Sequence, residues 1–301
     1  GHGGDTQFFH SSLSLLPEAN LGLFATINTG GEGARTSVAL ERAFFEHYFP
    51  ASLPAAKPPA DAGERNARYA GTYRTLRRSY TSFEKVFAAF GDENVAAMPD
   101  GTLLMPGVAN KPTRWVEVGD GVFRAANDDL FVAFKSDNGG AATSLVGPFV
   151  SIASERIAWY ESSTLHAFII GLGVLLFITV TVSAVRQRRN DAALAGGVRW
   201  ARPALALTGV LLLLFLIGIA LILAGGFTDL IYKIPTKLYV VLTFPLLAVP
   251  LALACVYFAV SIWRGRVWRF GTRLHYTLAT LSAVAFLFIL NYWNLLGYQF
   301  G

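Results

Sequence analysis

Residues 1–6 read GHGGDT and set an imidazole and a carboxylate among glycines. His2 and Asp5 can each bind or release a proton, and a second imidazole follows at His10. Gly3 and Gly4 carry no side chains, so a ligand can approach the backbone closely there. The three polar side chains could alternatively bind a metal ion. The other histidines are scattered without ligand spacing, so we expect neither a metal nor a cofactor.

These residues need strands and a helix to position them. Residues 7–16 and 21–28 are strand-like and flank a turn, which predicts a hairpin. Gly30-Gly31-Glu32-Gly33 precedes a helix predicted over 37–48, with Ser37 as a plausible N-cap. The glycine loop could alternatively hold a phosphate, but it lacks the Gly-Lys-Ser/Thr of a phosphate-binding loop. We therefore expect a turn there.

The first residues, the hairpin and the helix together resemble the third conserved sequence box of a serine hydrolase family and the elements that follow that box. The family includes class C β-lactamases, penicillin-binding proteins and related esterases and D-aminopeptidases. Its box is Lys-Thr-Gly, with His or Trp first in some relatives, and His2, Gly3 and Gly4 occupy those positions here. The resemblance implies that residues 1–50 are the C-terminal piece of a β-lactamase-like α+β catalytic domain.

The resemblance also implies a role for each residue of the box. His2 would lie beside the nucleophile and hydrogen-bond the substrate or the general base. Gly3 and Gly4 would leave room for the substrate, and the backbone N–H of Asp5 would donate to the oxyanion. Lys and Thr would grip a penicillin carboxylate, whereas His is at most partly charged near neutral pH. An esterase, amidase or peptidase acting through an acyl-enzyme is therefore favoured over a β-lactamase.

The family's nucleophile lies in a Ser-x-x-Lys box, which a Tyr-x-Asn box follows. We expect both boxes to be absent, because Tyr292-Trp293-Asn294 matches the second only within a predicted span. The chain is therefore predicted to be the C-terminal part of a longer protein and inactive by itself. Its partner would be the missing N-terminal catalytic portion. The substrate of the full-length protein would be a small molecule or a peptide. A tag remnant at Gly1-His2 is the alternative.

The next region is predicted to be a linker over 51–68 and a small antiparallel β domain over 69–161. The linker is rich in Ala and Pro, and the β domain has Asp-Gly and Asn-Gly turn signals at 100, 120 and 138. One short helix is predicted at 82–90. The expected strands are 69–74, 102–105, 114–118, 122–125, 130–135, 142–146 and 156–160.

The rest of the chain is predicted to be an α-helical membrane bundle of four spans. The composition is 53% hydrophobic and 15% charged, with a mean hydropathy of +0.44. Each of four stretches without Asp, Glu, Lys or Arg exceeds the roughly 20 residues that a helix needs to cross a bilayer. The spans are 163–185, 203–227, 238–263 and 274–296. The single cysteine, Cys255, lies in one of them and is expected to be a buried thiol.

Charge predicts the orientation of the bundle. Arginines gather between spans one and two and between spans three and four, which makes those loops cytoplasmic by the positive-inside rule. Residues 1–162 and the C-terminus would then be extracytoplasmic, in a multi-pass protein of the inner or plasma membrane. The formal charge of +5 thus reflects insertion into the lipid bilayer, and no nucleic-acid partner is expected.

Other functions stay open alongside a membrane-anchored hydrolase. The spans hold few polar residues, so we expect an anchor before a transporter or channel. The alternative from another class is a non-enzymatic four-span envelope protein, whose outward β domain binds a ligand or a partner.

Overall fold

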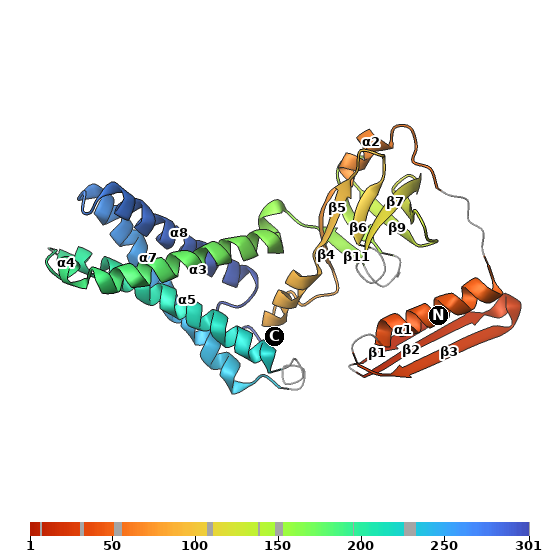
Figure 1. Cartoon of the computed structure of the whole chain (residues 1–301), viewed down its shortest axis with the longest axis horizontal. Helices are drawn as coiled ribbons and strands as arrows, with labels where there is room; N and C mark the ends of the chain where they lie inside the picture. The colour runs from red at the N-terminus through yellow and green to blue at the C-terminus, as the bar shows by residue number, and fades with distance from the viewer. Residues whose placement is uncertain are drawn as a thin grey trace. The chain divides into compact units, whose positions relative to one another are not determined.

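The computed structural model describes residues 1–6, 8–30, 33–50, 56–106, 111–137, 139–147, 153–194, 196–225 and 233–300 (Figure 1). Some residues of the sequence predictions lie outside these ranges: Gln7 of the first predicted strand, Gly31 and Glu32, linker residues 51–55, residues 107–110, 138 and 148–152 of the predicted β domain, and the loop and span end at 226–232. The chain divides into two compact units. One holds residues 1–70 and 95–134, and the other holds residues 71–94 and 135–301.

The N-terminal region forms a three-stranded antiparallel sheet in the order β1-β2-β3. Its strands are β1 (His2–Asp5), β2 (Phe9–Leu16) and β3 (Leu21–Asn28). A 3-10 turn, η1 (Pro17–Ala19), joins β2 to β3, and Asn20 closes it in the left-handed conformation, with φ of 51°. Asn tolerates this conformation better than most residues. The predicted hairpin is confirmed.

Helix α1 (Gly33–Tyr48) follows and packs on β2 and β3. It starts four residues before the predicted start, and its first residue, Gly33, lies directly against the ring of His10 on β2. A side chain at that position would collide with the imidazole. Ser37, the predicted N-cap, is instead a buried residue inside the helix.

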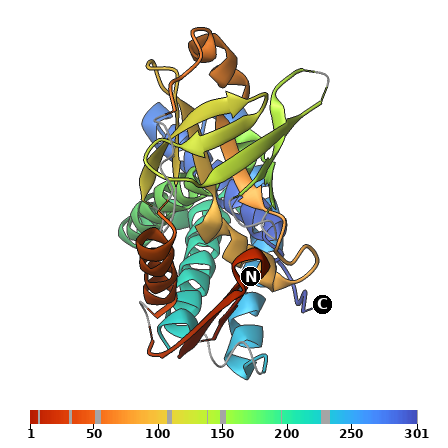
Figure 2. The ribbon, with the colours of Figure 1, turned by 90° about the vertical axis from the view of Figure 1, so that its right-hand side faces the viewer.

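Eight strands form a closed antiparallel barrel in the order β10-β11-β4-β5-β6-β7-β8-β9, visible from a second direction in Figure 2. Closure leaves the barrel without free strand edges. The strands are β4 (Gly71–Thr75), β5 (Glu93–Ala97), β6 (Leu103–Pro106), β7 (Pro112–Gly119), β8 (Val122–Ala125), β9 (Phe131–Ser136), β10 (Ala142–Val146) and β11 (Ala153–Arg156).

Most of the barrel strands are close to their predicted ranges, and two regions differ. The strand predicted at 156–160 is wrong, because β11 ends at Arg156 and Trp159–Glu161 form the 3-10 helix η5. The Glu161 carboxylate accepts the N–H of Ala158 at 2.9 Å and so caps that turn. β5 was not predicted. The predicted helix at 82–90 is the 3-10 helix η3 (Phe83–Gly91).

The end of the predicted linker has regular structure. Ala62–Arg65 form the short helix α2, and Asn66–Arg68 form the 3-10 helix η2. Asn66 is fully buried, and its side-chain amide donates to the carbonyl of Gly101 at 2.8 Å. This hydrogen bond fixes the turn before β6, where Gly101 has a φ of +76°.

Four long apolar helices follow in the described part of the chain: α3 (Ser163–Arg186), α5 (Ala201–Ala224), α7 (Thr236–Arg264) and α8 (Phe270–Tyr292). Each is long and apolar enough to cross a bilayer, which makes this a multi-pass membrane protein by length and composition. The starts of α3 and α7 and the ends of α5 and α8 lie at the end of the bundle that η3 contacts. We call this end the η3 end.

Small residues let the membrane helices approach closely. Gly209 of α5 lies under the ring of Phe177 of α3, and Gly218 of α5 lies under Val241 of α7. A Cβ at either glycine would collide with those side chains. Close backbone approach at glycine is how helices associate in lipid, where burial gives no hydrophobic gain.

Candidate functional site

The four residues of the predicted box lie together on β1, the edge strand of the three-stranded sheet. All four are exposed. β1 pairs with β2 alone in the described residues, with His2 opposite Leu13 and Asp5 opposite His10. The far edge of the strand is therefore open.

The open edge carries free backbone donors. Thr6 donates its N–H to the carbonyl of Phe9 across the β1–β2 ladder at 2.8 Å. Hydrogen-bonded and non-hydrogen-bonded pairs alternate in an antiparallel ladder, so Gly4 and His2 also direct their N–H groups at β2. The N–H groups of Asp5 and Gly3 then point away from β2, towards the open edge.

Alternation divides the four side chains between the two faces of the sheet. Asp5 lies on the face that α1 covers, together with His10, which lies against Gly33. Because neighbouring residues of a strand face opposite ways, His2 lies on the other face, which we call the outer face. Large apolar side chains are exposed on this face around His2: Phe9 (56%), Leu13 (39%), Leu15 (58%) and Phe24 (64%).

Asp5 and His10 are paired beneath the sheet. The Asp5 carboxylate lies 2.7 Å from Nδ1 of His10, and the carbonyl of Thr29 lies 3.0 Å from Nε2 of the same ring. Both partners are acceptors, so both contacts are hydrogen bonds only when the ring carries two protons. His2 faces the other way, so these three side chains do not converge on one ion. No group of metal-ligating side chains is found within the described ranges.

The prediction that the chain has no Ser-x-x-Lys is wrong, because Ser82-Phe83-Glu84-Lys85 has that spacing. The residues lie at the start of η3, and Ser82 is buried. Its hydroxyl is 2.6 Å from the hydroxyl of Ser79, while the Lys85 ammonium donates to the carbonyl of Tyr292 at 2.6 Å. The lysine thus caps the end of α8, and no hydrogen bond is recorded between it and the Ser82 hydroxyl.

The Tyr-x-Asn match at 292–294 lies against the same segment. Asn294 has a left-handed φ of 57°, and its side-chain amide donates to the carbonyls of Tyr80 (2.9 Å) and Ser82 (3.0 Å). The ring of Tyr292 lies 4.2 Å from the Lys85 ammonium. These contacts fasten the segment before η3 to the end of α8. A lysine and an amide occupied in this way are not arranged to activate a serine.

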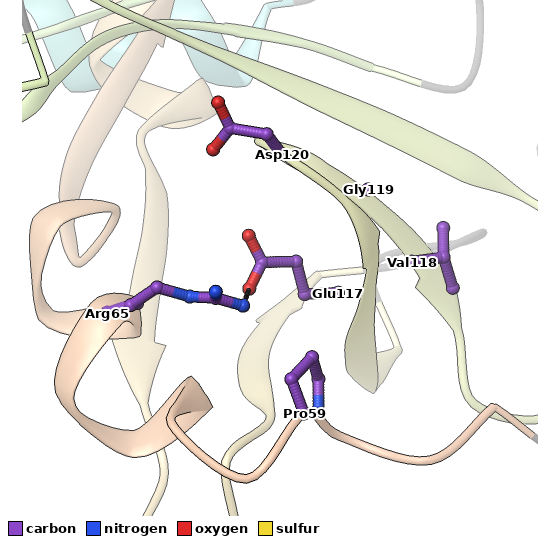
Figure 3. Close-up of a pocket in the computed structure, with 6 residues that line it drawn as sticks. All are labelled: Pro59, Arg65, Glu117, Val118, Gly119 and Asp120. Carbon is purple, nitrogen blue, oxygen red and sulfur yellow. Dashed lines mark hydrogen bonds and ion pairs between the residues drawn. The ribbon is translucent and has the colours of Figure 1, made fainter.

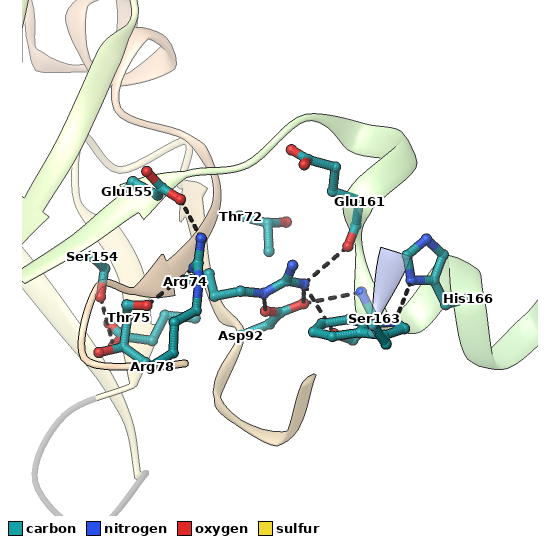
Figure 4. A network of polar contacts seen from close by, with 12 residues as sticks. Thr72, Arg74, Thr75, Arg78, Asp92, Ser154, Glu155, Glu161, Ser163 and His166 are labelled. Carbon is teal, nitrogen blue, oxygen red and sulfur yellow. Dashed lines mark hydrogen bonds and ion pairs between the residues drawn. The ribbon is translucent and has the colours of Figure 1, made fainter. Parts of the chain in front are cut away.

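A buried arginine joins the same region to β4 and α3 (Figure 4). Arg74 is 1% exposed and donates to both carboxylate oxygens of Asp92, at 2.7 and 2.8 Å. It also donates to the Tyr292 hydroxyl (2.7 Å), the Glu161 carbonyl (2.9 Å) and the Ser163 hydroxyl (3.1 Å). We call these residues the Arg74 cluster.

Charges in the Arg74 cluster are balanced by specific contacts. Burial alone would lower the pKa of Arg74, but its hydrogen bonds to Asp92 hold that pKa above its usual value. Burial lowers the pKa of Lys85, and the nearby guanidinium groups of Arg78 and Arg74 lower it further. Asp92 also accepts the N–H of Ser163 at 3.0 Å and so caps the start of α3. The cluster is thus a structural junction.

A histidine extends the junction into α3. His166 is buried, its Nδ1 accepts the indole N–H of Trp293 at 3.0 Å, and its Nε2–H donates to the carbonyl of Tyr160 at 2.9 Å. The two partners fix one neutral tautomer of the ring. Trp293 also stacks under Arg74, 4.6 Å from the guanidinium carbon.

The barrel has a separate, open pocket of about 350 Å³ (Figure 3). Arg65 and Glu117 form an ion pair at 2.6 Å in its wall, and Pro59, Val118 and Asp120 complete the lining with Gly119. The side chain of Glu117 is only 3% exposed. Both of its oxygens already have protein partners, Arg65 and the more distant Tyr69 hydroxyl at 3.5 Å.

A half-buried carboxyl group in the barrel makes stability depend on pH. Burial raises the pKa of Glu93, and Ser154, 3.5 Å away, only partly opposes this. The folded chain therefore holds this proton more tightly than the unfolded chain does. The protonated Glu93 carboxyl group therefore contributes to the free energy of unfolding at low pH. This contribution is lost as the pH rises through the pKa of Glu93 in the folded chain.

Replacing Glu93 with Gln should therefore raise the melting temperature at pH 7 and give little gain at pH 4. Melting curves of the parent and the Glu93→Gln variant between pH 4 and pH 8 measure the difference. An advantage of the variant that stays constant over this range, or grows as the pH falls, would contradict the assignment.

A scan against models of known protein families and a search of curated proteins both returned no match.

Proposed function

We propose that this chain is the C-terminal part of a membrane-anchored, extracytoplasmic serine hydrolase related to the class C β-lactamases. In this proposal β1 lines the active site, and the nucleophilic serine comes from protein outside these 301 residues. The observation that carries the proposal is the open edge of β1, which presents His2, two glycines and the outward N–H of Asp5.

The outer face of the sheet supports the proposal. Phe9, Leu13, Leu15 and Phe24 leave an exposed apolar surface around His2. Exposed apolar surface of this kind marks a place where other protein packs. A second layer covering this face would bring its own side chains next to His2, as a hydrolase domain completed by another segment requires.

The chemistry assigned to β1 is acyl transfer to an ester, amide or peptide. The Asp5 N–H would donate to the oxyanion, a contact that is typically worth about 3 kcal/mol of barrier. His2 would hydrogen-bond the substrate or the base that activates the serine. Gly3 and Gly4 would let the substrate lie along the strand.

We place the N-terminal sheet and the barrel outside the cell membrane. The loops at the end of the bundle opposite the η3 end are rich in Arg, as cytoplasmic loops are. The four helices would thus hold the hydrolase at the outer surface.

An activity probe tests the proposal. A fluorophosphonate should label the full-length protein and leave this 301-residue chain unlabelled. Ser82→Ala is the matched control, because Ser82 is the serine of the only Ser-x-x-Lys in this chain. Labelling of the 301-residue chain that disappears in Ser82→Ala would move the nucleophile to η3 and overturn the proposal.

Replacing His2 should slow the full-length enzyme. We expect His2→Ala to lower kcat/KM by about 10²-fold, with the melting temperature unchanged because His2 is exposed. His47→Ala is the control, since His47 is exposed on α1. Equal turnover in the parent and His2→Ala would remove His2 from the site.

The barrel pocket favours a second candidate, a non-enzymatic envelope protein that binds a ligand at Arg65 and Glu117. The reading frame upstream of Gly1 separates the two candidates. Ser-x-x-Lys and Tyr-x-Asn boxes within the preceding few hundred codons support the hydrolase, whereas a start codon directly before Gly1 supports the binding protein.

A further inference from the structure

The segment between β4 and β5 packs against the membrane helices. Phe83 and Ala88 of η3 are buried in the same apolar core as residues near the η3 end of the bundle, including Ile222, Leu238 and Leu290. Figure 1 draws this segment beside the end of the chain. The N–H of Phe83 donates to the carbonyl of Gln299 at 2.8 Å.

Several contacts fix the level of η3 along the bundle. Lys85 binds the carbonyl of Tyr292, the last residue of α8. Asp92, which follows η3, caps Ser163, the first residue of α3. η3 therefore lies where the membrane helices begin and end, which is the level of the bilayer interface.

Four of the exposed side chains at this level are aromatic. Phe90 of η3 is 78% exposed, and Tyr80, just before η3, is 52% exposed. Trp159 and Tyr160 precede α3 by a few residues and are 79% and 61% exposed. Side chains of this kind concentrate at the headgroup level of membranes, where an apolar ring meets a polar environment.

The aromatic surface continues the apolar surface of the bundle. Phe168, on the second turn of α3, is 68% exposed, and Leu172 and Leu175 further along the helix are exposed as well. Phe168 follows Trp159 by nine positions in the sequence, so exposed large side chains continue from the aromatic group onto α3. The Lys85 ammonium lies at the end of α8, on the Tyr292 carbonyl and over the Tyr292 ring.

We propose that η3 is a fifth membrane-contacting element, lying in the bilayer interface with Phe90, Tyr80, Trp159 and Tyr160 inserted among the lipid headgroups. Its partner is the interfacial region of the leaflet at the η3 end. β4, which leads into η3, would then be held at the membrane surface by η3 as well as by its contacts with the start of α3. This inference depends on the helices crossing a membrane and is independent of any catalytic activity.

Spin labelling in lipid nanodiscs tests this placement. A nitroxide is attached at Phe90→Cys, and separately at Trp159→Cys, and its collisions with oxygen and with a water-soluble nickel chelate are measured. The logarithm of the oxygen-to-nickel accessibility ratio is positive within lipid and negative in water. We expect a small positive value at both positions and a larger one at Phe168→Cys, the reference within α3.

The chain is well suited to this test, because its one native cysteine, Cys255, is fully buried. The parent chain, treated with the same nitroxide reagent, gives the background signal from Cys255. A negative value at both Phe90→Cys and Trp159→Cys, with a positive value at Phe168→Cys, would overturn the proposal. A negative value at Phe168→Cys would show that α3 does not face lipid there and would overturn it too.

Discussion

An Arg74→Ala variant should lose about 3–5 kcal/mol of unfolding free energy, because it leaves the Asp92 carboxylate buried without its cation. The same substitution removes the hydrogen bonds from Arg74 to Tyr292, Glu161 and Ser163. In a domain of this size the loss corresponds to a fall in melting temperature of roughly 10 °C. Thermal unfolding of the detergent-solubilised protein measures it.

Two further variants separate charge from geometry. Arg74→Lys keeps a positive charge but lacks the planar fork that binds both oxygens of Asp92, so an intermediate fall is expected. Arg77→Ala removes an exposed arginine from the same segment and should leave the melting temperature unchanged. Two results would contradict the role of Arg74 in this junction. One is an Arg74→Ala variant with the melting temperature of the parent, and the other is an Arg77→Ala variant whose melting temperature falls as much as that of Arg74→Ala.

Replacing Arg202 with Ala should destabilise the opposite end of the bundle by a similar amount, about 3–5 kcal/mol. Arg202 and Asp191 are 6% and 4% exposed, and their ion pair joins α5 to the short helix α4 (Arg188–Ala192) at 2.5 and 2.6 Å. The guanidinium also stacks on Trp268 at 4.1 Å. Removal of the cation leaves a carboxylate buried among apolar helices.

Arg199→Ala is the matched control, since it removes a neighbouring arginine that is exposed. It lowers the charge of the same loop by one, so any effect of loop charge on insertion appears in both variants. The double variant Arg202→Met/Asp191→Leu should recover most of the loss, because two apolar side chains avoid the cost of burying charge. A double variant as unstable as Arg202→Ala would argue against the ion pair as the cause.

The sequence predicts the elements of this protein well where one local signal dominates. Length and the absence of charge identify the four apolar helices, and β8 and β10 fall on the predicted residues, each after a turn signal. The run from Ile157 to Tyr160 reads as a strand by composition, yet it forms a turn because Glu161 caps it locally. Such competition between a side chain and the sheet is not visible in a β-propensity pattern.

The candidate site was predictable only in part. The resemblance singled out residues 2–5, but the face on which each side chain lies depends on pairing with β2 and packing against α1. The Arg74 cluster gave no signal, because its residues come from β4, the residue between η3 and β5, η5, α3 and α8. Ser82-Phe83-Glu84-Lys85 is a sequence motif with catalytic spacing whose polar side chains make structural contacts instead. Ser82 contacts Ser79, and Lys85 donates to the carbonyl of Tyr292.

The bond between Arg74 and Tyr292 spans 218 residues of sequence. Contacts of such separation form late during synthesis, because a chain emerges from the ribosome beginning at its N-terminus. β4 and η3 can therefore make these contacts only after α8 has been synthesised, and until then the Arg74 guanidinium and the apolar face of η3 lack these partners. Closure of the η3 end is thus a late step in the biogenesis of this chain.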